Sequence, residues 1–112
     1  MVEKIMLDYL TAKLSVPVYM EVPEEHDASY VVIERTGSSR EDHIDSPVMA
    51  FQSYGATLYD AAALNDQVKA AVDASVSLPT IGAVRFNSDY NYTNPDTKEY
   101  RYQSVYVITS LE

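Results

Sequence analysis

The sequence predicts an α+β fold with the element order α-β-β-β-α-β-β, a mainly antiparallel sheet and two helices packed on one of its faces. Apolar residues recur every three or four positions in only two segments, and the remaining apolar runs are short and rich in β-branched and aromatic residues. Runs of strands joined by turns, with only two helices, favour this class. A chain of 112 residues without internal repeats is expected to form a single domain over residues 1–112.

The first helix is predicted over residues 3–14. Its apolar stripe is formed by Leu7, Leu10 and Leu14. Pro17 ends the helical pattern, because the residue before a proline is displaced from helical geometry. A short strand over residues 16–22 follows, and Pro17 and Pro23 near its ends favour an edge position, since proline cannot donate to a strand ladder.

Two further strands are predicted over residues 30–36 and 48–54, which are rich in β-branched and aromatic residues. The residues between them, 37–47, are mostly polar and are expected to form a connection that is long for a hairpin. A polar connection of this length is able to reach a neighbouring molecule and to become ordered on contact.

The second helix is predicted over residues 56–75, where the apolar period changes from two to 3.6. Its apolar face is expected to contain Ala61, Leu64, Val68, Ala71 and Val72. Thr57, followed three residues later by Asp60, resembles a weak capping box. Small alanine side chains on this face allow a helix to approach a sheet closely.

The last two strands are predicted over residues 81–87 and 98–110, separated by a polar turn region at residues 90–97. In the final strand one face is expected to contain Tyr100, Tyr102, Tyr106 and Ile108. Tyrosine combines a large apolar ring with a polar hydroxyl, and this suits either a half-exposed strand or an interface that is wet before assembly.

The formal net charge of −9 disfavours a general nucleic-acid-binding protein, because such proteins neutralise phosphates with lysine and arginine. An acidic surface fits either simple solubility or a surface past which a polyanion must move without sticking. The longest uncharged run, residues 74–84, is too short and too polar to span a membrane. We therefore expect a soluble protein without membrane contacts.

Candidate catalytic chemistry is sparse. The absence of cysteine and the presence of only three glycines exclude a thiolate nucleophile and a glycine-rich phosphate loop. One polar segment gathers carboxylates around a histidine; its residues are Arg40, Glu41, Asp42, His43 and Asp45. Metal ligands usually come from several rigid elements, so these consecutive residues favour a solvated loop over a metal or acid–base site. We expect no enzyme activity, no cofactor and no metal.

Four stretches of the chain carry a resemblance to known proteins: residues 16–23, residues 30–40, residues 52–54 leading into 58–65, and residues 87–93 followed by 100–105. Together they resemble the small head–tail junction proteins of long-tailed bacteriophages and prophages of Gram-positive bacteria, in particular the tail terminator (tail completion) type. The resemblance covers nearly the whole chain and consists of strand and helix patterns rather than a catalytic signature.

The resemblance implies a structural subunit of the virion, made in the bacterial cytoplasm, that forms a ring on the end of the tail tube. Such a ring is usually a hexamer, and it stops tube growth and docks to the head connector. The implied partners are further copies of this chain, the tail tube protein and the head connector protein. Specific nucleic-acid binding is not implied, although DNA passes through the ring, whose lumen an acidic subunit keeps repulsive.

Ring closure requires two different patches on each subunit. The residues expected at a subunit or tube interface are Arg35, Arg40, Glu41, Asp42, His43, Asp45, Tyr100 and Tyr102. Arg35 and Arg40 are expected to make charge-assisted contacts with carboxylates of a neighbour, because guanidinium pairs well with carboxylate. The alternative is that both arginines are ordinary surface charges.

Three other functions stay open at the level of the sequence. The first is another head–tail connector or a minor capsid component, which shares the small size and element order. The second is an acidic inhibitor or immunity-type protein that blocks a basic partner and stays monomeric. The third is a small enzyme that uses the carboxylates of residues 40–45, and it predicts loss of activity on substitution of Asp42 or Asp45 with folding intact.

Overall fold

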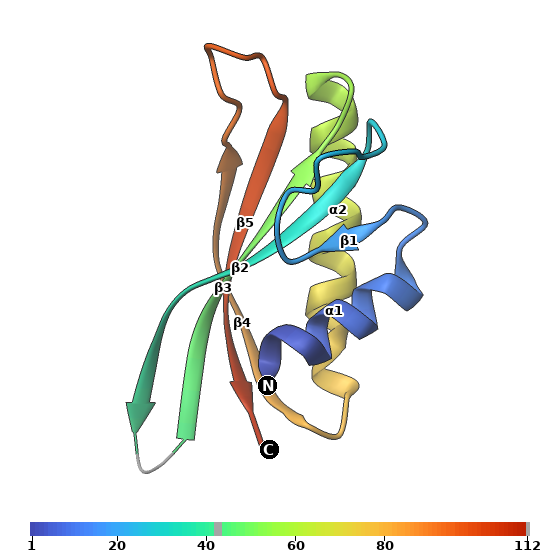
Figure 1. Cartoon of the computed structure of the whole chain (residues 1–112). Helices are drawn as coiled ribbons and strands as arrows, with labels where there is room; N and C mark the ends of the chain where they lie inside the picture. The colour runs from blue at the N-terminus through green and yellow to red at the C-terminus, as the bar shows by residue number, and fades with distance from the viewer. Residues whose placement is uncertain (42–43, 112) are drawn as a thin grey trace.

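The computed structural model describes the backbone of residues 1–41 and 44–111 and the side chains of residues 1–37 and 46–111. The elements are α1 (Val2–Lys13), β1 (Val18–Tyr19), β2 (Tyr30–Glu41), β3 (Ile44–Tyr54), α2 (Leu58–Ala74), a short 3-10 helix η1 (Ser75–Ser77), β4 (Ile81–Asn91) and β5 (Arg101–Ser110). Both α-helices lie on one side of a five-stranded sheet, and the other face carries no helix (Figure 1). The predicted class and element order are confirmed.

The strands lie in the order β1-β2-β3-β5-β4. All neighbours pair antiparallel except β1, which pairs with β2 in parallel through Val18 and Tyr19 alone. The short strand therefore lies at an edge, as its flanking prolines predict. It is shorter than the predicted range 16–22, and Met20 and Val22 beyond it are exposed.

The β2–β3 hairpin is longer than the sequence predicts. Residues 37–47 were expected as a polar connection, but the strands continue through this range, and Arg40 pairs with Asp45. That expectation is wrong for a physical reason. The end of the hairpin projects past the helices (Figure 1), so it needs no alternating apolar residues to cover a core, whereas Pro47 nearer its base is fully buried. A register shift between Arg35 and Gly37 marks the start of this projecting part.

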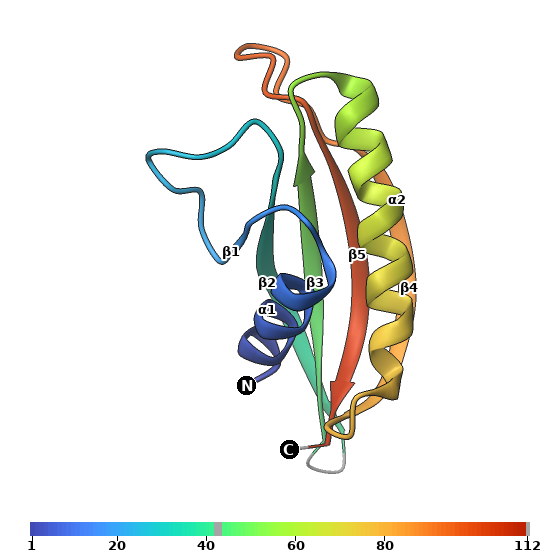
Figure 2. The ribbon, with the colours of Figure 1, turned by 90° about the vertical axis from the view of Figure 1, so that its right-hand side faces the viewer.

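The main core lies between the two helices and the sheet. Figure 2 looks onto this side, with α2 running along β5 and β4 and α1 lying beside β2. The two helices and three strands contribute the fully buried side chains Met6, Leu10, Ile33, Met49, Phe51, Val68, Val72, Tyr106 and Ile108. Full burial of one such apolar side chain stabilises the fold by about 1.5–3 kcal/mol. This packing holds the helices on one face.

The start of α2 is set by two neighbouring residues. The hydroxyl of Thr57 accepts a hydrogen bond of 3.1 Å from the backbone N–H of Asp60, which caps the helix as predicted. Gly55 lies so close to the first turn that a Cβ atom there would be 2.5 Å from the nitrogen of Ala61. The lack of a side chain at this position allows the chain to pass directly from β3 into α2.

Candidate assembly surface

Arg35 lies in the outer strand β2, where its guanidinium is near a carboxylate of its own chain. The Nη1 atom of Arg35 is 3.6 Å from Oε1 of Glu3 in α1, and the side chains are 36% and 17% exposed. The Oε1 atom of Glu3 is buried and accepts no hydrogen bond, so the two side chains are joined by charge alone. The predicted contact between Arg35 and a neighbouring subunit stays a prediction. It requires the Arg35 guanidinium either to leave Glu3 or to bind a carboxylate of the neighbour in addition to Glu3.

The other predicted charged residues belong to the end of the hairpin. The backbone of Arg40 pairs with that of Asp45, and Glu41 pairs with Ile44. The side chains of Arg40, Glu41 and Asp45 lie outside the described residues, as do Asp42 and His43 entirely. Their predicted role at an interface therefore stays a prediction.

Tyr100 and Tyr102 are both half-buried, but they belong to different parts of the chain. Tyr100 precedes β5, and its carbonyl accepts a hydrogen bond of 3.1 Å from the N–H of Gly55. Tyr102 lies within β5, which runs between β3 and β4 and forms no edge of the sheet. Tyr106, predicted on the same face, is fully buried, and its hydroxyl donates to the backbone carbonyl of Lys69 in α2. The lateral surface on this side of the sheet therefore belongs to β4.

The sheet has two open edges on opposite sides. β4 forms one edge, and Gly82, Arg85 and Phe86 along it are exposed. At the other edge β1 pairs only with residues 31 and 32, so the outer side of β2 is exposed at residues 34–37. Open edges present unpaired backbone groups to another chain. Both edges carry bulges, which limit indiscriminate pairing.

A row of polar side chains crosses the sheet face that carries no helix. The Nε2 atom of Gln52 donates to Glu34 at 3.2 Å and to Gln103 at 3.0 Å. Gln103 in turn donates to the hydroxyl of Tyr90 at 2.6 Å. Gln52 and Gln103 are only 7% and 8% exposed, so the row satisfies groups that a bare face would otherwise leave unpaired. It joins β2, β3, β5 and β4 side by side.

Next to this row, a cluster of tyrosine side chains and Arg101 covers part of the same face. The rings of Tyr30 and Tyr54 stack with centroids 4.4 Å apart, and the guanidinium of Arg101 donates to the Tyr54 hydroxyl at 3.0 Å. Burial raises the pKa of Tyr30 to about 12. Arg101 also lies 4.5 Å from the centre of the Tyr92 ring. Arg101 is thus held within its own chain.

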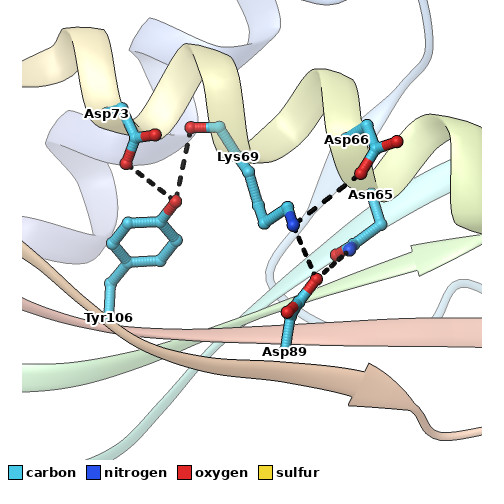
Figure 3. Close-up of polar contacts among 6 residues, drawn as sticks. All are labelled: Asn65, Asp66, Lys69, Asp73, Asp89 and Tyr106. Atoms are coloured by element: carbon cyan, nitrogen blue, oxygen red, sulfur yellow. Dashed lines mark hydrogen bonds and ion pairs between the residues drawn. The ribbon is translucent and has the colours of Figure 1, made fainter.

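A polar clamp fixes α2 to β4 and β5 (Figure 3). Lys69 donates to Asp89 at 2.7 Å, and the amide of Asn65 donates to the same carboxylate oxygen at 2.9 Å. The bond to Lys69 holds the pKa of the Asp89 carboxyl below its ordinary value, and the same bond raises the pKa of Lys69. One turn further along, the hydroxyl of Tyr106 donates to Asp73 at 2.9 Å. The clamp therefore holds the edge strand β4 in place.

The acidic excess is unevenly distributed. Exposed carboxylates lie on both helices, on the segment after β1 and in the turn before β5, at Asp8, Glu21, Glu24, Glu25, Asp27, Asp60, Asp66, Asp73, Asp96 and Glu99. On the sheet face without helices, the described strands carry Glu34 together with Arg85 and Arg101. Among the described side chains, the helices and the segment after β1 are therefore more acidic than the strands of the sheet face without helices.

Within the described part of the chain, no three His, Cys, Asp or Glu side chains lie together in a way that could hold a metal ion. No helix among the described residues has the length and apolar character needed to cross a membrane.

Sequence reasoning missed the contribution of β4. The predicted strand stopped at residue 87, because the residues after it are polar, yet the strand continues to Asn91. Asp89 there has its partners, Lys69 and Asn65, on α2. A lone Phe86 among polar residues was the one available signal of a contact surface, and it is 46% exposed.

No model of a known protein family matches this chain, and no curated protein matches it.

Proposed function

We propose that this chain is a tail terminator, a head–tail joining subunit that forms a ring on the end of a phage tail tube. The whole-chain resemblance described from the sequence supports this function. The observation that carries the proposal is the presence of two different open edges on opposite sides of one sheet, the outer sides of β2 and β4. An isologous dimer uses one patch twice, whereas a ring needs two patches that fit each other.

Pairing of the two edges joins one copy to the next in a repeating, head-to-tail manner. Each added copy again presents a free β2 edge on one side and a free β4 edge on the other. A series of such contacts forms a closed ring when the rotation from one copy to the next equals 360° divided by a whole number of copies. The bulges in both strands restrict which registers are possible, and this favours one rotation over a continuous range.

The projecting hairpin supports a second contact, along the axis of such a ring. It extends beyond the helices and away from the body of the subunit (Figure 1). Copies arranged in a ring would therefore present a circle of hairpins to the tube or to the connector. A hairpin that projects from its own core keeps its polar groups available for such a partner.

Electron microscopy of lysates tests this function directly. A phage or prophage that lacks the gene is induced, and the tails are measured beside those of the complemented strain. The proposal predicts abnormally long tails that are detached from filled heads. Tails of normal length overturn it; if unjoined heads lie beside them, the protein is a connector or minor head component instead.

The exposed carboxylates at Glu21, Glu24, Glu25 and Asp27 favour one alternative, an acidic inhibitor of a basic protein. This function predicts a chain that stays monomeric at all concentrations and binds one basic partner with strong salt dependence. Intact virions in the deletion lysate, together with a monomeric purified chain, would support it.

A further inference from the structure

An apolar groove lies between α1 and the segment that follows β1. Its volume is about 570 Å³, and it is lined by Leu7, Val18, Tyr19, Met20, Glu21, Val22, Pro23 and Glu24. Met20 is 46% and Val22 is 49% exposed, so apolar surface that a lone subunit would normally bury faces outward. The groove lies beside β1, at the β2 edge of the sheet.

The rim of the groove is acidic. Glu21 and Glu24 line it, and Glu25 and Asp27 follow on the same exposed segment. Lys13, at the end of α1, lies instead near the ring of Tyr9. A partner for this groove therefore needs an apolar side chain for the floor and a cation for the rim.

The opposite edge of the same molecule offers both groups. Phe86 in β4 is 46% exposed although it packs edge-on against Tyr106, and Arg85 beside it is exposed. Consecutive strand residues point to opposite faces, so Phe86 lies on the helical side and Arg85 on the other face. The ammonium of Lys69 lies 5.7 Å from the centre of the Phe86 ring, but it is paired with Asp89 and Asp66, so Arg85 is the cation that this edge offers.

We propose that the groove binds the β4 edge of a second copy of this chain, with Phe86 in the groove and Arg85 paired with Glu21 or Glu24. The inference rests on the proposed ring and names the surfaces that join its subunits. Donor and acceptor patches lie on opposite edges, so the contact is heterologous and repeats from copy to copy. Because opposite charges meet at the rim of the groove, the association rate should fall as the salt concentration rises.

Charge reversal with rescue tests the contact. Arg85→Glu places a carboxylate against an acidic rim, and the concentration at half-assembly in sedimentation should rise about tenfold or more. The variant Glu21→Arg/Glu24→Arg should show the same defect. The combination of all three substitutions should restore assembly to within about threefold of the wild type, which two unrelated defects cannot do. Lys13→Glu changes the net charge as Arg85→Glu does and serves as the control.

The apolar half of the contact has its own test. Phe86→Ala should weaken assembly about tenfold, because an aromatic anchor contributes a large share of the binding energy in such contacts. Tyr59→Ala is the matched control, since Tyr59 is 81% exposed in the first turn of α2 and neither lines the groove nor belongs to β4. Circular dichroism confirms that each variant is folded before assembly is measured.

The same variants are also supplied to the deletion phage, and tail length is measured. Long tails with Arg85→Glu and normal tails with the rescued combination support the contact in the virion. If all variants assemble and terminate tails like the wild type, the contact is wrong while the proposed function stands. If the deletion itself leaves tails of normal length, the proposed function fails, and the contact fails with it unless the purified chain still assembles with the predicted rescue.

Discussion

Lys69 of α2 and Asp89 of β4 form a hydrogen-bonded ion pair of 2.7 Å, with their side chains 28% and 27% exposed. The pair joins a helix to an edge strand that otherwise pairs with a single neighbour, β5. Because β4 is one of the two proposed ring contacts, this pair links the stability of the subunit to the shape of its assembly surface.

Asp89→Asn should lower the free energy of unfolding at pH 7 by about 1 kcal/mol, through loss of a charge-assisted bond that is partly screened by water. The folded state lowers the pKa of Asp89 below its ordinary value of 3.8. The contribution of the pair is therefore fully present well above pH 3.8 and is lost as the pH falls through the lower pKa of the folded state. Urea unfolding at pH 7 and pH 3 checks this: the difference between the two proteins should be smaller at pH 3 than at pH 7. A constant difference contradicts it.

Tyr106→Phe should destabilise the fold by about 1 kcal/mol, because it removes the hydroxyl that donates to Asp73 and leaves the buried ring in place. Burial, followed by the bond to Asp73, raises the pKa of Tyr106 well above its ordinary value of 10.0. In an ultraviolet titration the folded wild type and the variant should therefore gain the same phenolate absorbance near pH 10. An absorbance difference of one tyrosine at that pH would show that Tyr106 ionises normally.

Gln52→Ala should cost about 1–3 kcal/mol, since it leaves the amide of Gln103 and the hydroxyl of Tyr54 without their partner on a nearly dry face. Gln52→Leu combined with Gln103→Leu should cost less than the sum of the single substitutions, because both members of the buried bond are removed together. Chemical unfolding of the singles and the double measures this coupling. Additive losses would show that the row is not a network.

Replacement of residues 40–45 by an Asn-Gly turn should leave the subunit folded, with a change of at most about 1 kcal/mol, because it keeps the buried Pro47 and removes only the end of the hairpin that projects past the helices. Ser39 and Ser46 face each other in the sheet and provide the ends for a two-residue turn. The shortened chain should nevertheless fail to restore normal tail length to the deletion phage. Normal tails would show that the hairpin has no part in the docking.

Periodic patterns that face a core were readable from the sequence. Ala61, Leu64, Val68 and Val72 recur at helical spacing, and all four are buried in α2 as predicted. The capping role of Thr57 was readable for the same reason, since a helix start depends on a few consecutive residues.

Parts of the structure that have no side facing the core could not be predicted from the sequence. The projecting part of the β2–β3 hairpin has no apolar alternation, so it resembles a loop in sequence although it is a strand pair. The candidate surface depends on contacts between distant residues, such as Asn65 and Asp89 or Gln52 and Gln103. No local pattern marks these pairs, because each partner alone is an ordinary polar residue.

The central claim is that this chain caps a growing tail tube with a ring. The most direct measurement mixes the purified chain with assembled tail tubes of the same phage, adds further tube protein, and images the mixture by negative-stain electron microscopy. The account predicts a ring of density on one end of each tube and no lengthening at that end. Bare tube ends that continue to lengthen at the rate of untreated tubes would contradict it.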